Sequence, residues 1–189
     1  QIMHNPNDNE QILNDVNQWL DKVVIGLNLC PFASQPYKNQ QIRFAISHCN
    51  SDACLLEDLQ NELNLLAETK AESIETTLLI VPNMLEDFYD YNDFLEYVDA
   101  LIADNEWEGI FQVATFHPDY QFGGTEPEDT ENLTNRAPYP ILHLLREASL
   151  EKAIEHYPNP EEIPERNIET VSNLTLEQKT ALFPHIFKK

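Results

Sequence analysis

The sequence predicts an α/β fold in which a small, mainly parallel sheet of three or four strands is flanked by helices. Three short apolar runs are typical of buried strands, at residues 42–47, 76–81 and 109–115. Segments with the apolar spacing of helices lie between these runs, and this alternation favours parallel strand–helix–strand connections. The alternative is an α+β, ferredoxin-like layout, which requires residues 120–122 to pair back as a fourth strand.

The first three helices are expected before and between the strands. Residues 8–28 place apolar side chains three and four positions apart, with Asp8 as a candidate N-cap, and Pro31 follows as a break in the chain. The same spacing predicts helices over residues 52–69 and 85–104. The last of these is strongly acidic, so its outer face should be solvated.

A long loop follows the third strand and leads to a fourth helix, expected over residues 139–156. A proline-rich stretch at 158–164 then separates this helix from one or two short C-terminal helices. No internal repeat or low-complexity tract divides the chain. We therefore expect one domain over residues 1–189, with a frayed N-terminus at about residues 1–8 and a helical extension after the prolines.

The chain is strongly acidic, with 33 Asp and Glu against 11 Lys and Arg and a formal net charge of -22. Such a charge opposes binding to nucleic acid phosphates and to anionic membrane surfaces, so neither is expected as a partner. No segment has the length of a transmembrane helix, and no signal-peptide pattern begins the sequence. Three cysteines without CxxC spacing indicate neither a disulfide framework nor a zinc ribbon. A cytoplasmic protein is expected.

The segment 117–147, which follows the third strand, is the most informative stretch for function. It holds two of the six histidines and two of the four glycines. Loops between rigid elements often carry function, and the adjacent Gly123 and Gly124 indicate unusual backbone geometry. In a parallel sheet this segment would start at the carboxyl edge, where open α/β sheets bind ligands.

His117 and His143 are the candidate metal ligands or general bases of this segment. Pro118 restricts the backbone after His117 and would hold the imidazole in a set direction. The alternative is a histidine that closes the strand end by hydrogen bonding. His143 and Glu147 are four positions apart, so on a helix they would share one face and could bind one metal ion. Glu147 could instead orient the imidazole, or the pair could be a helix-edge histidine beside a solvated carboxylate.

Arg136, Asp119 and Cys30 complete the candidate site. Arg136 could bind a carboxylate of the substrate or a propionate of a cofactor, or it could only neutralise nearby acidic residues. Asp119, two residues after His117, is a candidate catalytic residue. Cys30 could be a thiolate ligand to haem iron, a nucleophile near an imidazole, or a buried cysteine that packs as a small hydrophobe.

Three separated motifs resemble one bacterial family. The stretches WLDKVVIGLNLCPF, FHPDYQFGG and LTNRAPYPILHLLRE occur in this order. Together they resemble the uncharacterised bacterial domain-of-unknown-function family 1415, from about residue 19 to about residue 166. The resemblance implies a cytoplasmic bacterial protein and no particular activity.

The leading hypothesis is a haem- or metal-dependent enzyme that carries out oxidative chemistry on a small organic, acidic substrate. One or both of His117 and His143 would hold the haem or a single transition metal ion, and Arg136 would hold an acidic group. One alternative is a cofactor-free hydrolase or transferase that uses Cys30 or a histidine-activated water. Another is a non-enzymatic protein whose acidic surface binds a basic partner. The expected partners are a small-molecule substrate and, as an option, a second copy of the chain in a homodimer.

Overall fold

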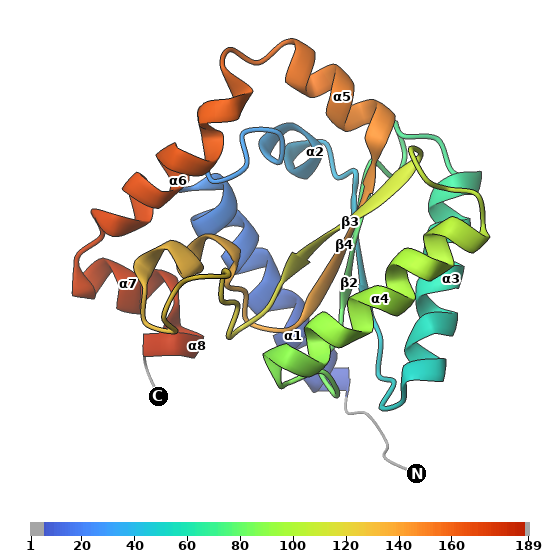
Figure 1. The fold of residues 1–189 in the computed structure, drawn as a ribbon, viewed down its shortest axis with the longest axis horizontal. Helices are drawn as coiled ribbons and strands as arrows, with labels where there is room; N and C mark the ends of the chain where they lie inside the picture. The colour runs from blue at the N-terminus through green and yellow to red at the C-terminus, as the bar shows by residue number, and fades with distance from the viewer. Residues whose placement is uncertain (1–5, 188–189) are drawn as a thin grey trace.

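The three predicted strands form, and a fourth, unpredicted strand lies among them. β1 (Ile42–Ile46), β2 (Thr76–Ile80) and β3 (Phe111–Phe116) coincide with the apolar runs. β4 (Ile141–Arg146) is the additional strand. The computed structural model describes residues 6–187, and its sheet has the strand order β1-β2-β4-β3 (Figure 1).

The sheet is mixed, so the expectation of a mainly parallel sheet is wrong. β1 and β2 pair in parallel, whereas β4 pairs antiparallel with both β2 and β3. Since β4 runs against both neighbours, β1, β2 and β3 all point the same way, as the alternation of strands and helices predicts. β4 separates β2 from β3, and this insertion replaces an expected parallel pair by two antiparallel ones. His143 thereby lies opposite Leu78 of β2 and Ala114 of β3.

The helix expected over residues 139–156 is wrong in its first half. That half contains β4, and the helical part is α5 (Glu147–Glu155). Periodicity alone cannot assign a short apolar run to a strand or a helix, and buried residues of β4 face both sides of the sheet. His143 and Glu147 therefore belong to different elements and do not share a helix face. The ferredoxin-like alternative is also wrong, because residues 120–122 lie in a loop and the fourth strand is β4.

The helices between the strands agree more closely with the sequence. The helical elements besides α5 are α1 (Pro6–Trp19), the π-helical turn η1 (Leu20–Ile25), α2 (Ser34–Lys38), α3 (Asp52–Glu68), α4 (Phe88–Asp104), the 3-10 turns η2 (Thr130–Asn135) and η3 (Pro160–Glu162), α6 (Ile163–Ser172), α7 (Leu176–Leu182) and α8 (Pro184–Phe187). α3 and α4 confirm two predicted helices, and each begins at a side-chain cap. Ser51 accepts the N–H of Cys54, and Asp87 accepts two N–H groups of the first turn of α4. Over residues 6–187, no helix is long and apolar enough to cross a membrane.

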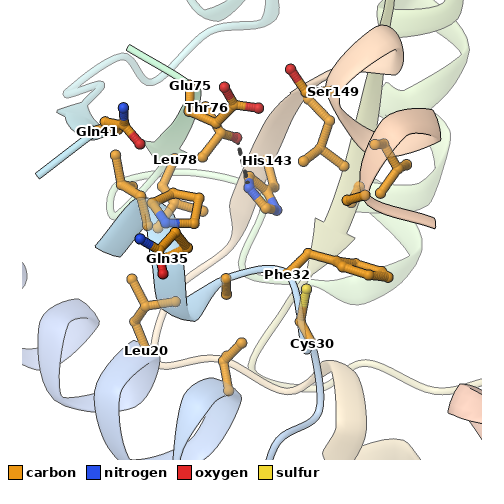
Figure 2. A pocket seen from close by; sticks show the side chains of 18 of the residues that line it. Leu20, Cys30, Phe32, Gln35, Gln41, Glu75, Thr76, Leu78, His143 and Ser149 are labelled. Atoms are coloured by element: carbon orange, nitrogen blue, oxygen red, sulfur yellow. Dashed lines mark hydrogen bonds between the residues drawn. The ribbon is translucent and has the colours of Figure 1, made fainter. Parts of the chain in front are cut away.

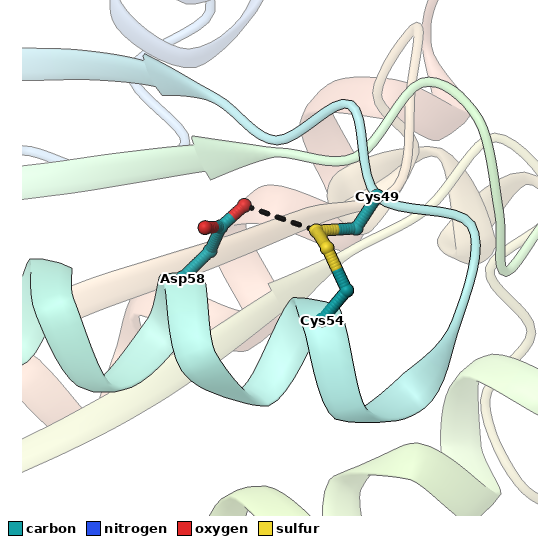
Figure 3. A group of neighbouring side chains, drawn as sticks. All are labelled: Cys49, Cys54 and Asp58. Atoms are coloured by element: carbon teal, nitrogen blue, oxygen red, sulfur yellow. Dashed lines mark hydrogen bonds between the residues drawn. A yellow bond between two sulfur atoms is a disulfide. The ribbon is translucent and has the colours of Figure 1, made fainter. Parts of the chain in front are cut away.

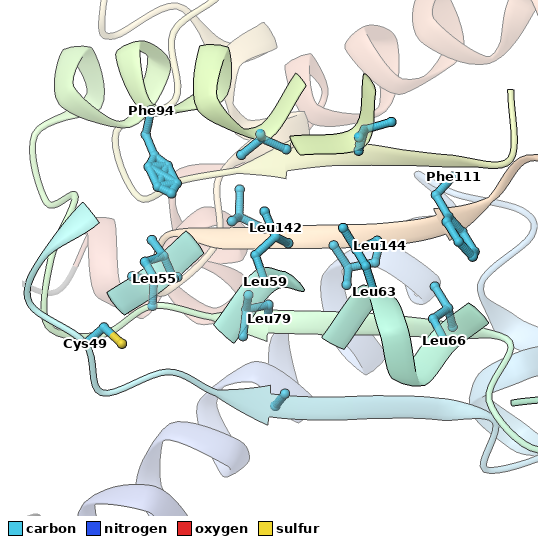
Figure 4. Packing of buried hydrophobic residues seen from close by; sticks show 14 of the residues in the cluster. Cys49, Leu55, Leu59, Leu63, Leu66, Leu79, Phe94, Phe111, Leu142 and Leu144 are labelled. Carbon is cyan, nitrogen blue, oxygen red and sulfur yellow. The ribbon is translucent and has the colours of Figure 1, made fainter. Parts of the chain in front are cut away.

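One face of the sheet packs against α3 and α4. Four leucines of α3 recur on one helix face and are almost completely buried: Leu55, Leu59, Leu63 and Leu66. They form one cluster with Leu79 of β2 and with Leu142 and Leu144 of β4 (Figure 4). Full burial of each such side chain contributes about 1.5–3 kcal/mol, so this layer is a major source of the free energy of folding.

The opposite face of the sheet is covered by α1, η1 and the C-terminal helices. Trp19 at the end of α1 clusters with Leu78 and Ile80 of β2. Val171 of α6 and Phe183 after α7 are fully buried in the same cluster. The helices after the proline-rich stretch therefore pack on the sheet, which lies between two helical layers (Figure 1). The two cysteines nearest α3, Cys49 and Cys54, form a disulfide that the sequence spacing does not indicate.

Candidate functional site

A cavity of about 550 Å³ lies on the α1 side of the sheet, and we call it the His143 cavity (Figure 2). Leu78, Ala114 and Phe116 line it from the strands, together with His143 of β4. Residues of η1, of the segment 30–36 and of α5 close its sides. A mostly apolar wall with a few polar groups is typical of small-molecule sites.

The π-helical turn η1 forms one wall of the His143 cavity. The N–H of Gly26 donates to the carbonyl oxygen of Asp21 at 2.9 Å, a five-residue spacing that widens the turn. Leu20 and Val24 of this turn line the cavity. A Cβ at position 26 would lie 2.2 Å from the carbonyl oxygen of Lys22, so this turn requires glycine. π-helical turns are frequent at functional sites, which supports the choice of this cavity.

Thr76 determines the tautomer of His143. The Thr76 hydroxyl has one proton, which it donates to the carbonyl oxygen of Leu144 at 2.5 Å. It therefore accepts at its 2.9 Å contact with Nε2 of His143, so Nε2 carries the proton. Nδ1 keeps its lone pair and has no hydrogen-bond partner among residues 6–187. The ring projects from β4 into the cavity (Figure 2).

The imidazole of His143 is neutral at physiological pH. Burial lowers its pKa to about 4, because the surrounding protein disfavours the charged form. Among residues 6–187, no carboxylate near the ring opposes this shift of the pKa. His143 therefore acts as a neutral hydrogen-bond acceptor at Nδ1.

Cys30 lines the same cavity as His143 (Figure 2). Burial raises the pKa of the Cys30 thiol, and hydrogen bonds from the backbone at Phe32 and Ala33 oppose this shift. The thiol is therefore protonated at neutral pH, and Cys30 is not a preformed thiolate. The structure thus brings His143 and Cys30, two of the predicted site residues, to one cavity, although they lie far apart in the sequence.

His117 lies outside the cavity, and the backbone occupies both nitrogens of its imidazole. The residue is completely buried. Nδ1 accepts the N–H of Asp119 at 2.9 Å, and Nε2 donates to the carbonyl oxygen of Leu85 at 2.8 Å. Burial also lowers the pKa of His117. This is the arrangement of a histidine that closes a strand end, and it leaves no lone pair for a metal ion or for general base catalysis.

Arg136 and Asp119 belong to the loop after β3 rather than to the cavity. Nε of Arg136 donates to the carbonyl oxygen of Tyr120 at 3.1 Å, and Nη2 donates to that of Pro127 at 2.6 Å. The carbonyl oxygen of Arg136 accepts the indole N–H of Trp19 at 3.0 Å. Burial lowers the pKa of Arg136, and the Asp119 carboxylate opposes this shift. The guanidinium therefore holds the loop together through Nε and Nη2.

The remaining charged candidates also have backbone roles. Glu147 begins α5, where its N–H donates to the carbonyl oxygen of Ile110 at 2.9 Å, and it does not line the cavity. Arg146 does line the cavity, but its guanidinium donates to the carbonyl oxygens of Thr69 and Ile74. Two of the three guanidinium nitrogens of Arg146, Nε and Nη2, therefore hold the backbone at the edge of the cavity.

The haem and metal hypotheses now depend on His143 and Cys30. The predicted metal ligands His117, His143 and Glu147 are not brought together. Within residues 6–187, one group of three His, Cys, Asp or Glu side chains is close enough to share an ion, and it lies elsewhere: Cys49, Cys54 and Asp58. The cavity itself supplies an imidazole nitrogen and a thiol.

One family model matches nearly the whole chain. It is described as a protein of unknown function, DUF1415, and it matches residues 11–181. The chain belongs to the DUF1415 family. This confirms the resemblance carried by the three sequence motifs, and every residue that lines the His143 cavity lies inside the DUF1415 match. No match was found among curated proteins or among solved structures.

The residue of this DUF1415 chain that sequence reasoning missed is Thr76. The sequence does indicate that Thr76 needs a partner. Two threonines open the otherwise apolar run TTLLIV, and buried hydroxyl groups need hydrogen-bond partners. The partner could not be named from the sequence, since His143 is assigned there to a helix. Gln35 and Ser149, which also line the cavity, carry no distinguishing pattern.

Proposed function

We propose that this DUF1415 protein binds a small, mostly apolar organic molecule that carries one hydrogen-bond donor. The donor, an O–H or N–H group, is directed at Nδ1 of His143. The observation that carries the proposal is the unused lone pair of a neutral imidazole in an apolar cavity of about 550 Å³. Buried polar atoms are nearly always hydrogen-bonded, so this lone pair suits a donor from a ligand.

The charges around the cavity favour a neutral or cationic ligand. The chain has a net charge of -22, and Glu75 lines the cavity. A ligand carboxylate would be desolvated near Glu75, and Nε and Nη2 of Arg146 already donate to backbone carbonyls. The acidic substrate expected from Arg136 is therefore not part of this proposal.

The distribution of side chains orients the ligand. Figure 2 shows Glu75 and Ser149 on the side of the cavity where Thr76 lies, and Leu20 and Phe32 on the other side. The apolar body of the ligand packs toward Leu20 and Phe32, and its polar end faces Thr76. Apolar contact supplies most of the affinity, and the hydrogen bond supplies selectivity.

Two probes of nearly the same shape test the proposal: 2-naphthol and 2-methylnaphthalene, which differ by a hydroxyl against a methyl group. The wild-type protein is expected to bind 2-naphthol roughly 3- to 10-fold more tightly, the equivalent of one net hydrogen bond. Fluorescence titration of the naphthalene ring gives both affinities. The His143→Leu variant removes the acceptor and keeps an apolar side chain, so it should bind the two probes equally.

Ala153 and Ala148 provide matched cavity variants on α5. Ala153 lines the cavity, whereas Ala148 is exposed on the same helix. Ala153→Leu should weaken binding of both probes by roughly 5- to 150-fold, since overpacking costs about 1–3 kcal/mol. Ala148→Leu should leave both affinities unchanged. Equal binding of the two probes to wild type, or binding that Ala153→Leu does not alter, would contradict the proposal.

A cofactor-free hydrolase or transferase is the second candidate, because the Cys30 thiol lines the same cavity as His143. The thiol would attack a carbonyl carbon, its proton would pass through His143 to the leaving group, and water would later release the acyl group. Burial raises the pKa of Cys30 and lowers that of His143, so the resting pair is uncharged. Proton transfer therefore has to accompany the attack.

Hydrolysis of 2-naphthyl acetate tests this second candidate. The wild-type protein should release 2-naphthol and acquire one acetyl group on Cys30, which intact-protein mass spectrometry detects. Cys30→Ala and His143→Leu should each abolish the acetylation, and Ala148→Leu should retain it. Release of 2-naphthol that survives Cys30→Ala would rule out the thiol mechanism and leave the binding proposal unaffected.

A further inference from the structure

A second cluster of reactive side chains lies on the α3 side of the sheet (Figure 3). Cys54 is in the first turn of α3, Asp58 is one turn further along the helix, and Cys49 is in the segment after β1. A disulfide joins the two cysteines. Oδ2 of Asp58 lies 3.2 Å from Sγ of Cys49. We call these three residues the Cys49 cluster.

The carboxylate of Asp58 is held in position by Ser47. The Ser47 side chain is buried, with 1% of the residue exposed, and its hydroxyl donates to Oδ2 of Asp58 at 2.7 Å. A disulfide sulfur has no proton to donate, so the contact between Asp58 and Cys49 is not a hydrogen bond in this state. After reduction, the Cys49 thiol can donate to the same oxygen.

The reduced Cys49 cluster has the donor set of a zinc site. In the disulfide form, the two sulfur atoms and one carboxylate oxygen of the cluster already lie within 4.8 Å of one another. Zinc binds thiolate sulfur at about 2.3 Å and carboxylate oxygen at about 2.0–2.2 Å, so ligands of one ion are separated by less than about 4.6 Å. Thiolates select zinc over magnesium or calcium. Ser47 is the kind of outer partner that orients a ligating carboxylate.

We propose that the reduced Cys49 cluster binds one Zn²⁺ ion and that oxidation to the disulfide releases it. On binding, the two thiols lose two protons, and the ion compensates two of the three negative charges of the thiolates and the Asp58 carboxylate. In the redox step, hydrogen peroxide takes two electrons from the two thiolates. The S–S bond forms, the O–O bond breaks, and two protons complete two water molecules. A dithiol reverses the step by giving its two protons and two electrons to the cysteines as it becomes a disulfide.

The cluster is accessible and separate from the His143 cavity. Cys54 is exposed, so oxidants, reductants and metal ions reach the site from solvent. Cys49 packs in the core between the sheet and α3, whereas the His143 cavity lies on the opposite face. The metal inference therefore does not rest on the proposed ligand binding.

Cobalt(II) is the probe for the test, because Co²⁺ occupies sulfur-containing zinc sites and its thiolate complexes absorb light. The whole protein is reduced with dithiothreitol, desalted without oxygen and titrated with Co²⁺. One equivalent should bind with sulfur-to-cobalt charge-transfer absorption, and one equivalent of Zn²⁺ should displace it. Hydrogen peroxide should abolish the absorption and remove two titratable thiols, and protein that was not reduced should bind no cobalt.

Substitutions identify the ligands. Cys54→Ser, at an exposed position, should abolish the charge-transfer absorption. Ser47→Ala should weaken cobalt binding by roughly 10- to 100-fold, and Asp58→Asn should weaken it further. Cys30→Ser removes the third cysteine and should leave binding unchanged. A disulfide that dithiothreitol does not open, no cobalt uptake by the reduced protein, or uptake that survives Cys54→Ser would each overturn the proposal.

Discussion

The hydroxyl of Thr76 lies 2.9 Å from Nε2 of His143, across the boundary between β2 and β4. Because that hydroxyl donates its own proton to Leu144, the imidazole has to donate at Nε2 and keep its lone pair at Nδ1. A threonine thus sets the chemistry of a histidine 67 positions later in the chain. The lone pair faces an apolar cavity, and this relationship supports both the binding proposal and the first prediction.

The tautomer of His143 is directly measurable. Nitrogen-15 NMR at pH 7 should show the proton on Nε2 in the wild-type protein. Thr76→Val leaves the ring N–H without its acceptor, so it should lower the free energy of unfolding by about 1–3 kcal/mol and let the Nδ1–H form appear. Thr115→Val is the control, because it replaces a threonine of β3 whose side chain lies on the other side of the sheet from His143. It should leave the spectrum of the His143 ring unchanged. An unaltered His143 spectrum in Thr76→Val would contradict the assignment.

Stability should fall as the pH decreases from neutral toward 4, in part through His143. Its pKa is about 4 in the folded protein and about 6.5 in the unfolded chain. Between these values the unfolded state binds more protons, so protonation favours unfolding. The loss from this residue should reach about 3 kcal/mol at pH 4. Urea unfolding of wild type and His143→Leu at several pH values isolates the contribution, and parallel curves for the two proteins would refute it.

His117 should matter for stability and not for ligand binding. His117→Ala leaves the carbonyl of Leu85 and the N–H of Asp119 without partners and creates a cavity under Phe88 and Tyr91. The expected loss in the free energy of unfolding is about 2–4 kcal/mol. At a temperature where the variant is folded, its affinity for 2-naphthol should equal that of wild type. A stable variant with abolished binding would return His117 to the functional site.

Gly26 should be more sensitive to substitution than Gly123. In Gly26→Ala the new methyl group meets the Lys22 carbonyl oxygen at 2.2 Å, so η1 must shift at a cost of about 1–3 kcal/mol. Because η1 lines the cavity, the affinity for 2-naphthol should fall as well. Gly123→Ala meets no atom within 4 Å, and its free energy of unfolding should change by less than about 0.5 kcal/mol. Thermal unfolding of both variants makes the comparison, and equal effects would contradict the π-turn argument.

The sequence predicts much of the fold because several segments have one clear periodicity. The leucines of α3 recur on one helix face, and Thr76–Ile80 is a short apolar run closed by Pro82. The segment of β4 is different, since buried side chains on both faces produce a pattern that a helix also fits. That single error places His143 on the wrong element and pairs it with Glu147.

The candidate site could be predicted only in part for a related reason. His143 and Cys30 are both singled out by residue type, and both line the cavity. His117 and Arg136 are singled out on the same grounds, yet both side chains make hydrogen bonds with the backbone. Residue type shows which chemistry a side chain can perform, and its partners in the fold determine whether that chemistry is available.

By itself the sequence determined the acidic character, three of the four strands, the helices between them, the DUF1415 family and a short set of reactive residues. Only the tertiary structure decided that β4 lies between β2 and β3, that Thr76 holds His143, and that Cys49 meets Cys54. Periodicity and composition are properties of one segment, so they can be read locally. Tautomers, cavities and ligand sets depend on atoms from segments far apart in the chain, and those contacts exist only once the sheet has assembled.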